Sequence, residues 1–117
     1  MRLLAAFLIA VTCAASIPAA LDAFQARAPL ADARTVLQEV ARAQAEYRAS
    51  HGRYTASLRA LGMRRPADVD VRITAEGAGG YAAVALAPAE ECAVYHGSAR
   101  PPRSYARTAG RIACRAR

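Results

Sequence analysis

Residues 3–50 read LLAAFLIAVTCAASIPAALDAFQARAPLADARTVLQEVARAQAEYRAS, and this stretch predicts one long helix with two halves of different character. The first half, residues 3–21, carries no charge and is bounded by Arg2 and Asp22. At about 1.5 Å per residue such a helix spans roughly 30 Å, the thickness of the hydrocarbon core of a bilayer. The residues that we expect to carry anchoring and assembly are Leu3, Phe7, Leu8, Ile9, Val11, Ile17 and Pro18.

The second half of the expected helix is amphipathic and continues to about Ser50. Its apolar stripe recurs in steps of three and four residues, the spacing that keeps side chains on one helix face. Pro18 and Pro29 are expected to kink or divide the helix, because proline removes a backbone donor. Pro29 alternatively begins a restarted helix. Gly52 suits the left-handed position after the last turn. The stripe consists of Leu30, Ala33, Leu37, Val40, Gln44 and Tyr47.

The N-terminal stretch has three interpretations. Its length and its continuation into an amphipathic stretch favour a retained membrane anchor. A secretory signal is the second, because Ala14 and Ser16 are small residues at a permissible cleavage spacing before Ile17. A lipoprotein signal at Cys13 is the third, although the residues before Cys13 match it poorly. We therefore expect residues 1–21 to be an anchor or a signal segment, and residues 22–117 to form the head.

The head is small enough to need a covalent link in addition to its core. Cys92 and Cys114 both lie in the expected head, whereas Cys13 lies in the apolar stretch. Disulfides persist in the periplasm and outside the cell. For an exported chain we therefore expect a Cys92–Cys114 disulfide, which stabilises the fold by roughly 3 kcal/mol in the chain-entropy model.

The head sequence after residue 52 predicts a small antiparallel sheet. Residues 69–74 alternate apolar and polar side chains, as a half-buried strand does. A glycine-rich turn at 76–80 leads into a second strand at 81–86, and further strands are expected at 92–95 and 111–114. The expected fold is therefore α+β, with the long N-terminal helix packed on an antiparallel sheet of three to four strands.

The sequence contains no constellation typical of an active site. His51 and His96 lack the Glu/His or Cys/His spacing of a metal site, so we expect two ordinary surface histidines. Residues 77–80 lack the Lys-Ser/Thr of a phosphate-binding loop, so they are expected to form a turn. We expect a protein that is not an enzyme and that has no cofactor, no metal and no small-molecule substrate.

Charge is concentrated at the C-terminal end. The net charge is +7, and the last eighteen residues, from Arg100 to Arg117, contain six arginines and no acidic residue. Such a segment is either a solvated charged tail or a surface that contacts the phosphates of DNA or another anionic surface. The candidate contact residues are Arg100, Arg103, Arg107 and Arg111.

Several motifs occur together along the chain. In the N-terminal part they are Ile17-Pro18-Ala19, Asp22, Phe24, Ala26-Arg27-Ala28, Leu30 and Asp32-Ala33. Further along they are Ala43-Gln44-Ala45-Glu46-Tyr47, Gly52-Arg53-Tyr54, Ser57-Leu58 and Leu61-Gly62. Together with the Cys92/Cys114 pair, these motifs resemble the N-terminal helix, the following loop and the C-terminal disulfide-bounded loop of type IV pilins and pseudopilins.

The resemblance implies a non-enzymatic structural subunit of a type IV pilus or a type II secretion pseudopilus. Its partners would be the inner membrane, other pilin or pseudopilin subunits and, through the basic loop, DNA. The head would lie in the periplasm or in an extracellular filament. The family's cleavage motif is missing, and no acidic residue precedes Asp22. If Pro18 aligns with the family's proline, the cleavage site falls upstream of Met1. Either the start codon is then assigned too far downstream, or the chain is a diverged relative that prepilin peptidase cannot process.

The alternative function belongs to another class. If the apolar stretch is a signal peptide that is removed, the mature chain is a small secreted or periplasmic binding module. It would act as a monomer that the internal disulfide stabilises, with its helix packed only on its own sheet.

Overall fold

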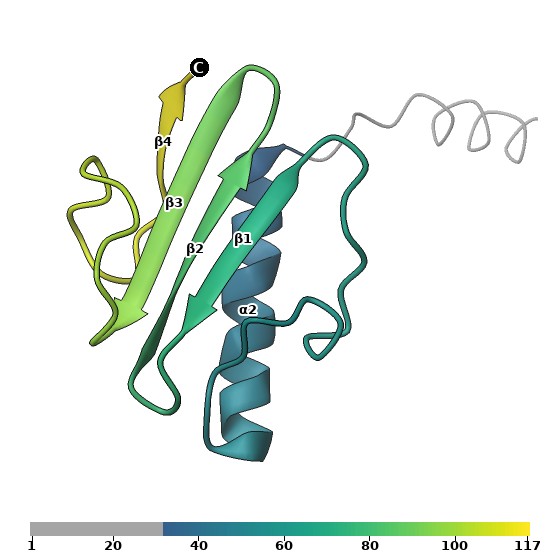
Figure 1. Cartoon of the computed structure of the whole chain (residues 1–117), viewed down its shortest axis with the longest axis vertical. Helices are drawn as coiled ribbons and strands as arrows, with labels where there is room; N and C mark the ends of the chain where they lie inside the picture. Colours follow the sequence, from purple (N-terminus) through teal and green to yellow (C-terminus); the bar gives the residue numbers. More distant parts are fainter. Residues whose placement is uncertain (1–31) are drawn as a thin grey trace, which may run out of the picture. The chain divides into compact units, whose positions relative to one another are not determined.

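The computed structural model describes residues 32–117, which form one helix and a four-stranded antiparallel sheet (Figure 1). Helix α2 spans Ala33–His51. The strands are β1 (Asp70–Ala75), β2 (Gly80–Leu86), β3 (Glu90–Gly97) and β4 (Ala113–Ala116), and they neighbour one another in that order. The expected anchor over residues 3–21 lies outside the described residues. Within them, no helix is long and apolar enough to cross a membrane.

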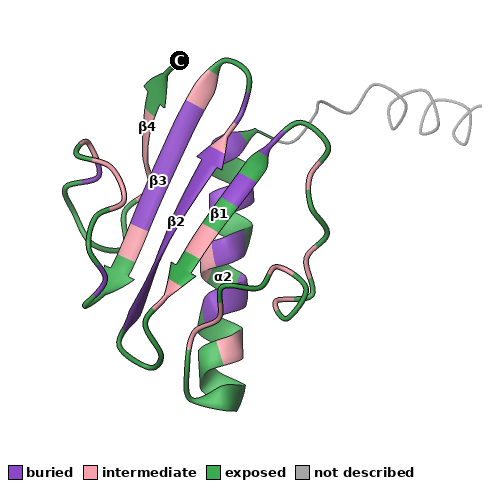
Figure 2. Ribbon diagram, in the orientation of Figure 1, coloured by how far each residue is buried: buried purple, intermediate pink, exposed green. Residues whose placement is uncertain are grey.

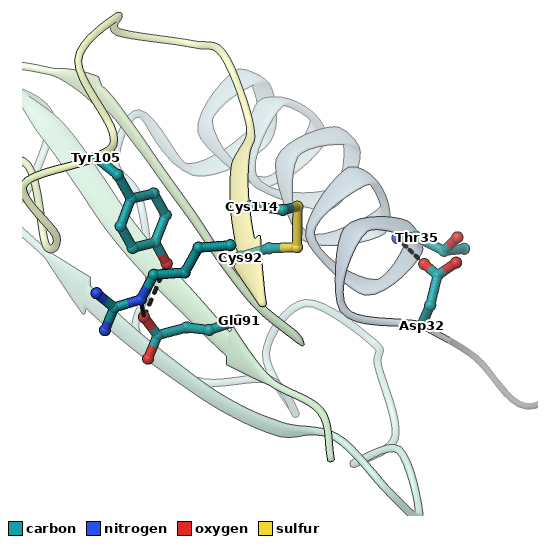
Figure 3. Close-up of a disulfide and its surroundings, with 7 residues drawn as sticks. Asp32, Thr35, Glu91, Cys92, Tyr105 and Cys114 are labelled. Atoms are coloured by element: carbon teal, nitrogen blue, oxygen red, sulfur yellow. Dashed lines mark hydrogen bonds and ion pairs between the residues drawn. A yellow bond between two sulfur atoms is a disulfide. The ribbon is translucent and has the colours of Figure 1, made fainter. Parts of the chain in front are cut away.

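The expectation of one long helix over residues 3–50 is wrong. Asp32 has an extended backbone with φ −94° and ψ 166°, so α2 begins only at Ala33. The Asp32 carboxylate accepts a hydrogen bond from the Thr35 backbone amide at 2.7 Å (Figure 3). This bond satisfies an amide that the first turn of a helix leaves without a partner, and it lowers the pKa of Asp32. Asp32 is therefore the N-cap of α2.

The C-terminal end of α2 agrees with the sequence prediction. Gly52 has φ 72°, in the left-handed region, and its amide donates to the Arg48 carbonyl oxygen at 2.8 Å. A residue without a Cβ adopts this conformation at little cost, so the helix stops there and the chain turns away.

Helix α2 packs on one face of the sheet through an apolar stripe. Four members of the expected stripe are buried, while Tyr47 is half-buried and Leu30 lies outside the described residues. The buried side chains of α2 are Ala33, Val36, Leu37, Val40, Ala43 and Gln44. The last of these is polar, and its amide group bonds the Thr55 carbonyl oxygen and amide at 2.6 and 3.1 Å. This pair of bonds fixes the segment that leaves the helix.

Strand β2 is covered on both faces, as Figure 2 shows by its burial. Tyr81, Ala83 and Ala85 belong to the core cluster beneath α2. Successive strand residues point to opposite faces, and Val84 accordingly belongs to a second cluster with Ala93 and Ala106. Because Ala106 comes from the connection between β3 and β4, this connection covers the sheet face opposite α2.

Candidate functional site

The predicted disulfide between Cys92 and Cys114 is present. The two residues lie directly opposite each other on β3 and β4, with their Cα atoms 4.0 Å apart. Cys92 is fully buried in the core beneath α2. The disulfide thus closes the base of the connection between β3 and β4, which we call the C-terminal loop (residues 98–112).

A second attachment of the C-terminal loop lies on the other face of the sheet and is centred on Glu91. The Glu91 side chain is nearly buried, with 5% of its surface exposed. Its carboxylate accepts hydrogen bonds from the Tyr105 hydroxyl and from Arg115 Nε, both at 3.0 Å, and forms an ion pair with Arg103 at 3.3 Å. Figure 3 shows Tyr105 reaching Glu91 on the side of β3 away from the disulfide. We call these four residues the Glu91 cluster.

The Glu91 cluster shifts the ionisation of its acidic members. Burial alone raises the pKa of the Glu91 carboxyl, but the Tyr105 hydrogen bond and the charges of Arg103 and Arg115 outweigh it, so the pKa lies below its usual range. Burial, together with the hydrogen bond to Glu91, raises the pKa of Tyr105 to about 12. At neutral pH the carboxylate is therefore charged and the hydroxyl keeps the proton that it donates.

The four candidate arginines of the loop do not share one environment. Arg103 is half-buried, and its guanidinium group pairs with Glu91 and donates to the Pro102 carbonyl oxygen at 2.9 Å. Arg100, Arg107 and Arg111 are exposed. The structure therefore separates one arginine that fastens the loop from three whose side chains face solvent.

The sequence interpretation missed Glu91 and Tyr105. A signal for Glu91 was nevertheless present, because it is the last acidic residue in the chain and is followed by six arginines. Strand alternation also places it on the face opposite Cys92, where the C-terminal loop returns. Tyr105 has no comparable signal, since its position depends on how the loop folds.

The two histidines lie in aromatic contacts, and one further group of residues has the spacing of metal ligands. His51 stacks on Tyr47, with ring centroids 4.0 Å apart, and both residues belong to the last turns of α2. His96 lies beside Tyr81, with a centroid distance of 6.0 Å, and near Tyr54 of the segment that follows α2, with a centroid distance of 6.2 Å. Glu90 approaches the two cysteines closely enough to resemble a metal site. Because both sulfur atoms are consumed by the disulfide, this group has no thiolate to offer a metal.

The remaining candidate residues, which we expect to carry anchoring and assembly, lie outside the described residues. Comparison of the chain with protein-family models, with curated proteins and with solved structures finds no match.

Proposed function

We propose that this protein is a non-enzymatic structural subunit of a filament of the type IV pilus or type II secretion pseudopilus kind. Residues 3–21 hold it in the inner membrane, and the head lies in the periplasm or on the filament surface. One observation carries the proposal: a helix, an antiparallel four-stranded sheet and a disulfide-closed C-terminal loop follow one another in a single small head. This order supports the resemblance that the sequence motifs suggest. The uncharged segment before the head supplies the membrane attachment that such a subunit needs.

The proposed mechanism is assembly. In the membrane, the uncharged segment contacts copies of itself, and the small residues Ala5, Ala6 and Ala10 permit close approach. In the head, the apolar face of α2 is used by the chain's own sheet. The exposed face of α2 is polar and carries the Arg42–Glu46 ion pair at 2.9 Å. Contacts between heads are therefore polar, while association in the membrane supplies the apolar contact.

Cys13 provides a direct test of this assembly. It is the one cysteine outside the Cys92–Cys114 disulfide, and it lies within the uncharged segment. Mild oxidation of membranes that contain the full-length protein should produce a disulfide-linked dimer, and Cys13→Ser should abolish it. Intact mass and N-terminal sequencing of the membrane and soluble fractions complete the test. A soluble mature species that begins near Ile17 or Leu21, without a dimer, would rule out the filament subunit.

That negative outcome would favour the second candidate function, a secreted or periplasmic binding module. The observation in its favour is that the C-terminal loop is attached on both faces of the sheet, by the disulfide on one side and by the Glu91 cluster on the other. A loop held in this way presents a preorganised surface, which lowers the entropy cost of binding.

A further inference from the structure

A pocket of about 210 Å³ lies between α2 and the end of the sheet where β2 begins and β3 ends. Its walls come from four parts of the chain: the middle of α2, the segment that follows α2, the facing ends of β2 and β3, and the end of the C-terminal loop. The lining residues are Ala41, Ala45, Tyr54, Tyr81, His96 and Gly110.

The pocket exists because the residues on two of its walls, on α2 and at the end of the C-terminal loop, have small side chains or none. Ala41 and Ala45 are one turn apart on the same flank of α2, and each contributes only a methyl group. Strand β4 pairs with β3 only over Glu90–Ala93, so it does not reach His96. Gly110 takes its place there, and its amide donates to the Tyr95 carbonyl oxygen at 2.7 Å. A glycine adds no side chain to fill the space.

Three aromatic rings converge on the pocket. The Tyr54 and Tyr81 ring centroids are 5.1 Å apart, and His96 lies 6.0 Å from Tyr81 and 6.2 Å from Tyr54. The Arg48 guanidinium group lies over the Tyr54 ring, 5.5 Å from its centroid. A flat apolar body can therefore contact ring surfaces on one side of the pocket, close to a positive charge.

The Tyr81 hydroxyl is the group that points to a ligand. The residue is 4% exposed, yet its hydroxyl has no hydrogen-bond partner among residues 32–117. In the same part of the chain no side-chain nitrogen or oxygen is both sealed from solvent and without a partner, so this hydroxyl keeps contact with solvent-accessible space, and Tyr81 is one of the residues that line the pocket. Burial, and secondarily Tyr54, raises the pKa of Tyr81 to about 12. The hydroxyl therefore keeps its proton at neutral pH and is available as a donor.

We propose that this pocket binds a carboxylate attached to a single aromatic ring. The ring lies against Tyr54 and Tyr81, and the carboxylate accepts a hydrogen bond from the Tyr81 hydroxyl, with His96 as a second donor. The Tyr81 hydroxyl offers a donor, the six lining residues include no acidic side chain that would repel an anion, and the Arg48 guanidinium group over the Tyr54 ring favours a negative charge nearby. The size agrees, since a cavity of about 150 Å³ holds benzene, which leaves room for a carboxylate. This proposal is independent of filament assembly.

Two sources supply this chemistry: a free aromatic acid, and the C-terminal residue of a polypeptide that ends in phenylalanine. The test is an NMR titration of the full-length protein with sodium benzoate and, separately, with N-acetyl-Gly-Gly-Phe. Both backbone amides and tyrosine ring signals are followed. We expect saturable shifts at Tyr54, Tyr81 and Gly110 with a Kd on the order of 1 mM or lower for one probe. Tighter binding of benzoate identifies a free acid, and tighter binding of the peptide identifies a chain end.

Two variants, one control variant and one further probe test the geometry of the proposed site. Tyr81→Phe keeps the ring and removes the donor, so affinity should fall about 3- to 10-fold, as expected for one hydrogen bond. Ala45→Leu fills the pocket from an exposed helix position and should abolish binding, whereas Ala49→Leu, on α2 but outside the pocket lining, should not. Acetate should not bind at this site. The proposal is overturned if neither aromatic probe gives saturable shifts, if acetate matches benzoate, or if Tyr81→Phe binds as well as the wild type.

Discussion

The Glu91 side chain holds the C-terminal loop against the sheet. Its carboxylate is the common acceptor for Tyr105, Arg103 and Arg115. Glu91→Gln keeps the size and removes the charge, so two guanidinium groups lose their counter-charge. Because both arginines remain partly exposed, solvent screens part of this loss. We expect the free energy of unfolding in urea to fall by about 1–3 kcal/mol.

The adjacent residue provides the control for this substitution. Glu90 has no ion pair among the described residues and is half-buried on the opposite face of β3. Glu90→Gln should change the free energy of unfolding by less than about 0.5 kcal/mol. Equal effects of the two substitutions would show that the Glu91 cluster does not hold the loop.

The pH dependence of stability follows from the same cluster. The pKa of Glu91 is lower in the folded state than in the unfolded chain. Its contribution to stability is therefore complete above the unfolded pKa, about 4.3, and is lost as the pH falls through the lower folded pKa. The difference in unfolding free energy between wild type and Glu91→Gln should be constant from neutral pH to about pH 5 and should shrink below about pH 4. A difference that stays constant down to about pH 3 would contradict this assignment.

At the scale of elements, the disulfide determines whether β4 remains part of the sheet. β4 has four residues and pairs only with β3. The disulfide closes a loop with a sequence separation of 22 residues, which corresponds to about 3 kcal/mol in the chain-entropy model. The double variant Cys92→Ala/Cys114→Ala should lose about this much unfolding free energy. In hydrogen exchange, β4 amides should lose protection first, while β1 and β2 amides exchange only with global unfolding.

Chemical reduction tests the effect of breaking the disulfide without changing the two cysteine side chains to alanine. Wild type treated with a phosphine reductant should show the same loss of protection in β4 as the double variant. The reductant should not affect the variant itself. If reduction leaves β4 protected, the Glu91 cluster alone is enough to hold the end of the chain.

The element boundaries show what the sequence could and could not predict. Residue alternation located β1 and β2 to within one residue at each end, because one face of β1 is exposed and glycines mark the turn between them. β4 begins at Ala113, two residues later than expected, because its register is set by the cysteine pair rather than by its own pattern. The start of α2 was missed for a related reason. Periodicity reports which face is apolar, whereas the break at Asp32 depends on a side-chain bond to Thr35.

The candidate sites divide in the same way. The disulfide could be predicted because only two cysteines lie in the expected head. The pocket could not, because its walls meet only after α2, β3 and the C-terminal loop have packed together. Its residues are alanines, a glycine and common aromatics, which have no distinctive pattern in the chain.

At the scale of the whole molecule, the remaining question is what the positive charge at the C-terminal end contacts. The net charge is +7, and the chain after Glu91 contains no acidic residue. Arg103 is neutralised by Glu91, so a phosphate-binding surface on the loop would consist of Arg100, Arg107 and Arg111. Proteins that neutralise phosphates release counterions, and their affinity for DNA therefore falls as salt rises.

The triple variant Arg100→Ala/Arg107→Ala/Arg111→Ala should bind duplex DNA more weakly than wild type in fluorescence anisotropy. If all three residues contact phosphates, the slope of log affinity against log salt should become shallower by about 2 to 3, because each contact contributes about 0.9. A matched variant, Arg53→Ala/Arg64→Ala/Arg65→Ala, removes three other exposed charges and is expected to change the slope less. Equal effects would indicate attraction by net charge alone. Arg103→Ala should lower the unfolding free energy, because it removes the ion pair with Glu91. It should not change the slope, because a guanidinium group that is paired with a carboxylate does not contact a phosphate.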